Sequence, residues 1–319
     1  MVGGEGMLGR AILTELARRG IPCRGCPPPA TPARRAALRR SLARRRPETV
    51  YWAPPERAGV GRHRRRPATL AGHALSAFGA AIDACRAAGV PRLVNIVPHC
   101  AYPGAAPVPL RETTPRDGPP DPGLLAYGAA MRLTIALAAA YRAEHGLFTL
   151  SPIVAGLYGP GDLFDAADGQ VVGAMIRRFG DAVRRGDDRV PCWGDGAAER
   201  ELLYVDDAAA LIVSPAALPE ESFKPWPDTV VNIGGAHAGA RFVSTATLAA
   251  AVAAAQGFEG RIEWDRDAPR GRPRVALDDG RLAGLVPAHA ALPLAEGLAR
   301  AVADERAAVV AGRGAGAAA

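Results

Sequence analysis

Strand-like and helix-like segments alternate along most of this chain of 319 residues, and this alternation limits the possible folds more than any other feature. β-Rich runs at 49–52, 93–97 and 147–154 are separated by alanine-rich stretches with helical spacing at about 69–88 and 125–145. Parallel strands need crossover helices of this kind, and the helices then cover both faces of the sheet. The pattern predicts an α/β fold: a Rossmann-type parallel sheet with helices on both faces.

A glycine loop opens the chain. Residues 4–9 fit the pattern G-x-G-x-x-G, and Gly3, Gly6 and Gly9 fit the related spacing G-x-x-G-x-x-G. A helical stripe follows the loop directly, so the glycines would bring the backbone and a helix N-terminus close to a diphosphate group. We therefore predict that these three glycines bind a nucleotide cofactor.

Two features of the N-terminal region count against a complete dinucleotide site. Only Met1 and Val2 precede the glycines, so the first strand of the sheet is nearly absent. No acidic residue lies between Glu15 and Glu48, where a carboxylate usually holds the ribose hydroxyls. Two interpretations remain open: the start of the reading frame is misassigned and a strand is missing, or cofactor binding has decayed.

Composition argues against several classes of protein. The 39 basic and 32 acidic residues give a formal charge of +7, and the arginine-rich stretches at 34–46 and 62–66 have no interleaved aromatic residues. Such stretches are typical of a solvated helix face and a loop rather than a nucleic-acid site. No uninterrupted apolar run approaches the ~20 residues of a membrane span. We expect neither nucleic acid nor a membrane as a partner.

The five cysteines are scattered and follow no signal peptide, which predicts free thiols and a cytoplasmic location. Cys23 and Cys26 have the spacing of a redox or zinc motif, but no second pair or histidine cluster completes it. We therefore expect no metal site.

Ordered blocks of sequence resemble the extended short-chain dehydrogenase/reductases that act on nucleotide sugars, and most closely the GDP-L-fucose synthases. The blocks run through nearly the whole chain, at 50–53, 100–103, 157–162, 177–179, 193–207, 231–234 and 269–274. The resemblance implies a nucleotide sugar, GDP-linked by the closest similarity, and NADP or NAD as cofactor. It also implies a homodimer formed through the helices at 69–88 and 125–145.

The resemblance implies two catalytic residues. Tyr127 stands where the family exchanges a proton during hydride transfer, and Cys100 stands where it epimerises a 4-keto sugar. The lysine expected four residues after the tyrosine is replaced by Met131. A phenol without a neighbouring cation is a poor base at neutral pH. Arg132, five positions on, is expected to point away from the tyrosine.

Two further catalytic positions of the family are altered. Its serine is replaced by Pro98, and its downstream histidine by Gln170. His99 is displaced by one residue, and on a strand it would face the opposite side of the sheet. We therefore interpret His99 as a bystander.

The positions that bind the nucleotide sugar in the family match this sequence better than the catalytic positions do. Arg200 matches an arginine that reaches the nucleotide diphosphate, a task suited to a forked guanidinium. Arg178 is expected near it, and Trp193 is expected to pack on the base. Asp206 and Asp207 are interpreted as caps of the following helix.

Later segments indicate a smaller lobe, with strands at 230–234 and 261–264 and helices around Leu248 and from Leu294. We expect a Rossmann-type cofactor domain at residues 1–160 and a substrate lobe at 161–311 that is partly interleaved with it. Residues 312–319 are expected to form a disordered tail.

Two hypotheses about function follow. The first is a nucleotide-sugar epimerase/reductase with impaired hydride chemistry, in which epimerisation outlasts reduction. The alternative is a catalytically inactive pseudoenzyme that binds a nucleotide sugar, suggested by the changes at Pro98, Met131 and Gln170. A third possibility, nucleic-acid binding, rests on arginine content alone.

Overall fold

The computed structural model describes residues 1–54, 58–115, 117–235, 237, 239, 242–268 and 272–312. Residues 269–271, part of one block of the resemblance, lie outside the described residues, as does the tail from residue 313 onward.

The centre of the molecule is a parallel sheet. Strands β1 (Thr49–Trp52), β2 (Arg92–Asn95) and β4 (Phe148–Val154) lie side by side, and β3 (Val97–Pro98) and β8 (Val230–Ile233) both pair with β4. All of these pairings are parallel, which confirms the predicted Rossmann-type sheet. The expected strand at 230–234 is therefore part of this sheet and not of the smaller lobe, because its partner is set by long-range packing.

Both faces of the sheet are buried. Along β1, Val50 and Trp52 enter one hydrophobic cluster and Tyr51 enters another, as the two-residue period of a strand requires. The first cluster contains side chains of α2 (Pro32–Arg45), α4 (Pro67–Ala87) and α5 (Leu125–His145). The second contains side chains of α1 (Met7–Arg18) and α7 (Val205–Ala216). Two helical layers therefore enclose the sheet.

Helix α5 is unusually apolar. The segment Pro122–His145 is long and apolar enough to cross a membrane by length and composition, although Arg132 lies in its middle. In the fold it packs against α4, and Met131 and Thr134 on its inner face are completely buried. About a third of its apolar window is buried.

The first strand of the sheet is reduced to one residue, as predicted. Val2 forms parallel bridges with both Trp52 and Cys26, and its main-chain N–H donates to the carbonyl of Tyr51 at 2.8 Å. The chain therefore enters the sheet only briefly before the glycines. The glycine loop consequently begins at the carboxyl edge of the sheet, where ligands bind in folds of this type.

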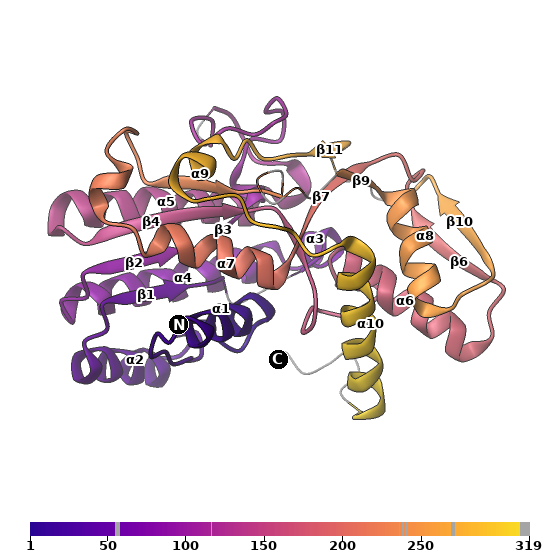
Figure 1. Ribbon diagram of the computed structural model, residues 1–319, viewed down its shortest axis with the longest axis horizontal. Coiled ribbons are helices and arrows are strands. Elements are labelled where there is room, and N and C mark those ends of the chain that lie inside the picture. Colours follow the sequence, from indigo (N-terminus) through magenta and orange to yellow (C-terminus); the bar gives the residue numbers. More distant parts are fainter. Residues whose placement is uncertain are drawn as a thin grey trace.

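A smaller group of elements lies at one end of the molecule (Figure 1). It contains a parallel pair of strands, β6 (Arg189–Trp193) and β10 (Arg261–Asp265), with α6 (Val171–Arg185) and α8 (Thr245–Gln256). Helix α10 (Leu294–Val310) packs against both α6 and α8. Figure 1 shows α1, α2 and α4 toward the opposite end.

A third sheet contains the strand that carries Arg200. In it β7 (Glu199–Tyr204) pairs in parallel with β5 (Gly156–Tyr158) and β11 (Arg274–Val275), and antiparallel with β9 (Phe242–Ser244). The remaining elements are short helices: α3 (Val60–Arg65), α9 (Gly280–Leu285), η1 (His99–Ala101), η2 (Pro122–Leu124) and η3 (Glu220–Phe223).

Candidate functional site

Three positions of the glycine loop exclude a side chain: Gly3, Gly9 and Gly4. Gly3 has a φ of 81°, and a Cβ there would lie 2.8 Å from the carbonyl oxygen of Ala53. A Cβ on Gly9 would lie 2.2 Å from the carbonyl oxygen of Gly3. Gly6 is exposed and is the N-cap residue of α1. The loop thus presents bare backbone and a helix N-terminus, an arrangement that fits the diphosphate of a dinucleotide.

The segment beside the loop carries a cation instead of an acid. Gly4 lies against Gly25, to which a Cβ on Gly4 would come within 2.9 Å. This neighbouring segment contains Arg24, which is exposed, while Glu5 on the loop is also exposed. The loop therefore fits a diphosphate, but the carboxylate that normally holds the ribose is missing from this segment.

His99 occupies a different position from the one expected. It begins the short helix η1 instead of continuing strand β3, so the alternation of faces along a strand does not apply to it. Burial and the nearby Arg200 and Arg272 lower the pKa of His99 to about 4, while a hydrogen bond with the main chain of Val154 acts in the opposite direction. The assumption that residue 99 continues the strand was therefore wrong, whereas the interpretation of His99 as a bystander stays a prediction.

Cys100 is next to His99 but is held as a thiol. Burial raises the pKa of Cys100 to about 12, and the Arg132 guanidinium only partly opposes this effect. Arg132 also donates from Nε to the carbonyl of Ala101 at 2.5 Å and contacts the carbonyl of Gly118. The hydrogen bonds of Arg132 to these two carbonyls therefore fix its guanidinium next to η1. The thiol is a poor base in this state, although it remains able to donate a proton.

Tyr127 lies near the start of α5. Its ring is buried and lies 4.7 Å from the ring of His63, measured between centroids. Both residues line a pocket of about 430 Å³ together with Gly123 and Ala126. Met131, one turn further along the helix, is completely buried in the hydrophobic core, so position 131 supplies no cation near the phenol.

Arg200 is held by backbone and not by carboxylates. Its Nη1 donates to the carbonyls of Glu199 and Arg272, both at 2.8 Å. Arg272 donates from Nε to the carbonyl of Gly104 at 3.0 Å and from Nη2 to that of Pro103 at 2.5 Å. Within the described part of the chain, neither guanidinium pairs with a carboxylate, so both keep their charge for an anion. Burial lowers the pKa of both arginines.

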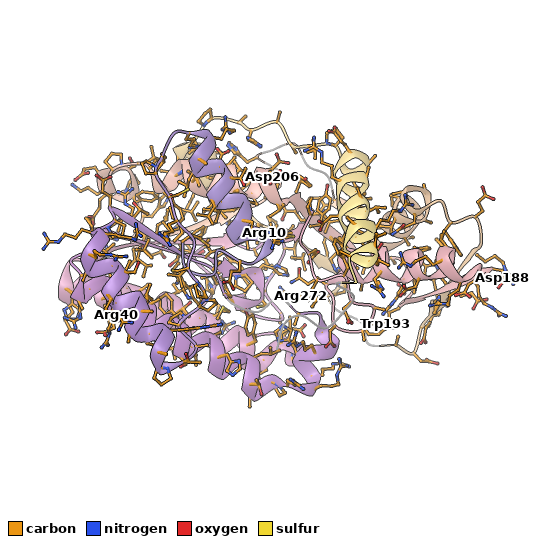
Figure 2. The ribbon with its side chains drawn as sticks, turned by 90° about the horizontal axis from the view of Figure 1, so that it is seen from below. Arg10, Arg40, Asp188, Trp193, Asp206 and Arg272 are labelled. Atoms are coloured by element: carbon orange, nitrogen blue, oxygen red, sulfur yellow. The ribbon has the colours of Figure 1, made fainter. Side chains whose placement is uncertain are left out.

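Arg178 and Trp193 contact each other. The guanidinium of Arg178 lies 4.6 Å from the centroid of the Trp193 ring and donates to the carbonyl of Ala166. Trp193 is 40% exposed, which leaves ring surface for a further partner. Figure 2 shows Arg272 near the middle of the molecule and Trp193 toward the smaller lobe. Nothing in the geometry places Arg178 in direct contact with Arg200.

Other expected residues have structural partners. Arg177, in the block 177–179, pairs with Asp181 at 2.9 Å. Asp207 accepts hydrogen bonds from His289 and from the main chain of Leu292, so it joins two segments instead of capping α7. Gln170 is the N-cap residue of α6.

Sequence reasoning overlooked Arg272 and His63. Arg272 belongs to the quoted block 269–274, but no spacing rule assigned it a role. It reaches Gly104 across 168 positions of sequence. His63 stands within an arginine-rich stretch that gave no signal of its contact with Tyr127. Both contacts depend on tertiary structure.

Comparison with known proteins agrees with this arrangement. Residues 1–234 match the model of the NAD dependent epimerase/dehydratase family. The chain is 31% identical to GDP-L-fucose synthase 1 of Arabidopsis thaliana over 287 residues, covering 89% of this chain and 86% of the relative. A GDP-L-fucose synthetase from Naegleria fowleri bound to NADP has the same fold, with a TM-score of 0.80 at 18% identity over 97% of this chain and 94% of the other.

A second solved structure has equal coverage of both chains. A GDP-6-OMe-4-keto-L-xylo-heptose reductase from C. jejuni has a TM-score of 0.81 at 20% identity over 96% of each chain. The fold, the ordered sequence blocks and these relatives agree. The chain belongs to the NAD dependent epimerase/dehydratase family, as a GDP-L-fucose synthase-like extended short-chain dehydrogenase/reductase.

Proposed function

We propose that this protein acts on a GDP-linked 4-keto sugar, which it epimerises efficiently and reduces poorly. The observation that carries this proposal is the position of two arginines, Arg200 and Arg272, which are joined by a hydrogen bond and have no carboxylate partners among the described residues. Such a pair is what a nucleotide-sugar enzyme needs to hold the diphosphate and orient the adjoining sugar.

The nucleotide is recognised at two places in this proposal. Arg200 binds the diphosphate, because a guanidinium that is kept from water makes strong charge-assisted bonds to phosphate. Trp193, with its exposed ring and Arg178 behind it, packs on the base. GDP is proposed as the nucleotide because relatives at about 30% identity are named GDP-L-fucose synthases.

The cofactor proposed is NADP, which supplies hydride transfer when bound. Gly3, Gly6 and Gly9 would hold its diphosphate against the N-terminus of α1. Tyr127 would exchange the accompanying proton. Reduction is weak because Met131 places an apolar side chain where a cation would favour the ionised phenol.

Calorimetry with GDP, a GDP-sugar, NADPH and NADP⁺ tests binding, and two assays on a GDP-linked 4-keto hexose test chemistry. We expect uptake of solvent deuterium beside the ketone to exceed the rate of NADPH oxidation. Brisk NADPH-dependent reduction by the unmodified protein would contradict the proposal. Failure of GDP and GDP-sugar to bind would remove it altogether.

A second function is favoured by the buried Met131. If the protein binds a nucleotide sugar but shows neither exchange nor reduction, it is a pseudoenzyme whose role is to bind that ligand. The same assays separate the two functions, because the pseudoenzyme retains binding and loses both activities.

We also propose a homodimer formed through α4 and α5. Leu125 and Leu133 on α5 are 50% and 53% exposed, on a helix apolar enough to pass for a membrane span. A second copy would cover this face and bury apolar area. Light scattering should give twice the mass of the chain, and Leu133→Glu should yield a monomer. A monomeric wild-type protein would contradict this proposal.

A further inference from the structure

His63 and Tyr127 form a ring-to-ring contact at the place where position 131 supplies no cation. Their ring centroids lie 4.7 Å apart, with an angle of 48° between the ring planes. Both side chains are buried and both line the pocket of about 430 Å³. The distance between the centroids is inside the ~6 Å within which a cation interacts with an aromatic ring. A proton on His63 would therefore place a positive charge beside the phenol.

The helix that carries His63 is held in place on two sides. At the start of α3 the main-chain N–H of Gly59 donates to the carbonyl of Asp168 at 2.6 Å, and at its end Arg65 forms an ion pair with the Asp168 carboxylate. On another side α3 packs against η2, the short helix that leads into α5. The contact between His63 and Tyr127 is thus set by the same packing that positions the start of α5.

The ionisable groups on α3 are arginines. They are Arg62, Arg64 and Arg65, and the charge of Arg65 is balanced by Asp168. Arg64 is exposed and lines the same pocket as His63. Arg66 follows as the N-cap residue of α4, whose first turn has no ionisable side chain.

Two further ionisable groups come from the elements packed against α3. From η2, Asp121 lies near Arg64, because a Cβ on Gly123 would come within 3.2 Å of Asp121 Oδ1 and within 3.9 Å of Arg64 Nε. From α5 the group is Tyr127 itself. Imidazole changes its charge between pH 5 and 8, and the excess of arginines disfavours its protonated form. We therefore expect His63 to gain its proton only in acid.

We propose that protonated His63 supplies the positive charge beside Tyr127 that Met131 does not, and that reduction by this protein is therefore faster in acid. This inference rests on the proposed function. A neighbouring positive charge stabilises the ionised phenol, so it makes the hydroxyl a stronger acid. His63 acts through Tyr127 and is a positioning residue. Arg132 does not take this part, because its hydrogen bonds hold it next to η1.

The step conserves atoms and electrons. The ketone carbon receives a hydride from a reduced nicotinamide dinucleotide, and the ketone oxygen takes the hydroxyl proton of Tyr127. The phenolate left behind lies beside the imidazolium of His63, which stabilises the negative charge. A proton from solvent then restores the phenol, so each turnover consumes one hydride and one proton. His63 keeps its own proton throughout and changes the strength of the acid without changing the stoichiometry.

The dependence of reduction on pH tests this inference. With NADPH and a GDP-linked 4-keto hexose, kcat/KM of the unmodified protein should rise by roughly tenfold or more from pH 8.5 to pH 5.5, as His63 gains its proton. His63→Gln should remove the rise and keep the alkaline rate at every pH. His145→Gln is the matched control, because the His145 ring also contacts a tyrosine, Tyr141 at 5.2 Å, but is exposed at the end of α5. This control should keep the rise.

His63→Lys tests the charge directly. The pocket borders position 63 and gives the longer side chain room, and an ammonium is still protonated at pH 8.5. Reduction by this variant at pH 8.5 should therefore reach the level of the unmodified protein at pH 5.5. Without any cofactor, ultraviolet difference titration against a second Tyr127→Phe substitution should show Tyr127 ionising about one pH unit or more lower in His63→Lys than in His63→Gln. Circular dichroism checks that both variants fold.

The outcomes separate this inference from the proposed function. A flat pH profile in the unmodified protein, or an acid rise that survives in His63→Gln, would overturn the inference and leave the proposed function intact. The same holds if folded His63→Lys and His63→Gln show the same ionisation of Tyr127, or if NADPH is not oxidised even at pH 5.5. If His63→Lys does not fold, the comparison of His63→Gln with the unmodified protein decides. Failure of GDP and GDP-sugar to bind would overturn the proposed function itself.

Discussion

Arg200 donates a hydrogen bond from Nη1 to the main-chain carbonyl of Arg272 at 2.8 Å, across 72 positions of sequence. The bond joins β7 to the segment before β11, and it uses a carbonyl as acceptor, so the positive charge of Arg200 is not cancelled. The Arg200 guanidinium is thereby held at the backbone of Arg272, whose own guanidinium donates to the carbonyls of Pro103 and Gly104, just after η1. This pair is the structural basis of the binding site that we propose.

Substitution of Arg200 by alanine should weaken GDP binding by ~2–3 kcal/mol, the scale of a charge-assisted bond lost from a site shielded from water. Arg200→Lys should recover part of this loss because it keeps the charge without the forked geometry. Calorimetry with GDP measures both effects. Arg189→Ala, an exposed arginine on β6 beside Asp188 and Glu263, is the control. Unchanged affinity in Arg200→Ala would remove this residue from the site.

Cys100 should resist alkylation at neutral pH. Because burial raises its pKa to about 12, roughly one thiol in 10,000 is ionised at pH 8, and only the thiolate reacts. Iodoacetamide labelling followed by peptide mass spectrometry should modify the exposed Cys23 first, and Cys100 labelling should rise with pH. Labelling of Cys100 as fast as Cys23 at pH 7 would contradict the raised pKa and show a stabilised thiolate that could act as a base.

Replacement of Met131 by lysine should lower the free energy of unfolding, and this loss should be larger than any gain in the rate of reduction. The side chain is completely buried in the core between α5 and the sheet, so an ammonium there costs roughly 3 kcal/mol and its pKa is lowered. Met131→Leu should cost less than about 1.5 kcal/mol. Urea unfolding compares the two variants, and NADPH oxidation shows whether Met131→Lys gains activity. A lysine variant as stable as wild type would mean that the new side chain reaches solvent or a ligand beside Tyr127.

Glu305 should be essential for docking α10 on the smaller lobe. Its side chain is 1% exposed and accepts from Arg184 at 2.9 Å. Glu305→Gln removes the buried charge, but Arg184 is one-third exposed and also pairs with Asp181, so the free energy of unfolding should fall by about 2 kcal/mol, the scale of a hydrogen bond to a charged group. Glu296→Gln, which breaks an exposed pair with Arg300 on the same helix, should cost less than about 1 kcal/mol. Similar losses of unfolding free energy in both variants would show that the buried pair stabilises the protein no more than the exposed pair does.

The elements of the central sheet were predictable because their signals are local. The run at 49–52 coincides with β1, and the helix expected at 125–145 coincides with α5. Val2, directly before Gly3, forms parallel bridges with Trp52 and Cys26, as a residue of the first strand would. Hydrophobic periodicity and glycine spacing depend on neighbours within a few positions, which a single sequence contains.

Partners across the fold were less predictable. The strand expected at 230–234 was assigned to the smaller lobe, but residues 230–233 pair with β4 in the central sheet. Asp207 was expected to cap a helix but binds His289 and the main chain of Leu292, 82 and 85 positions away. No local pattern specifies which distant segment a strand or carboxylate meets.

The sequence by itself determined the family, the parallel sheet, the glycine loop and the loss of a cation at Met131, because each depends on residue identity and short spacing. Tertiary structure decided the surroundings of His99. Its orientation depends on the chain leaving β3 for η1 at that residue, and its basicity depends on two arginines brought from β7 and from the segment before β11. Electrostatic interactions act through space, so their partners are fixed only when the chain has packed.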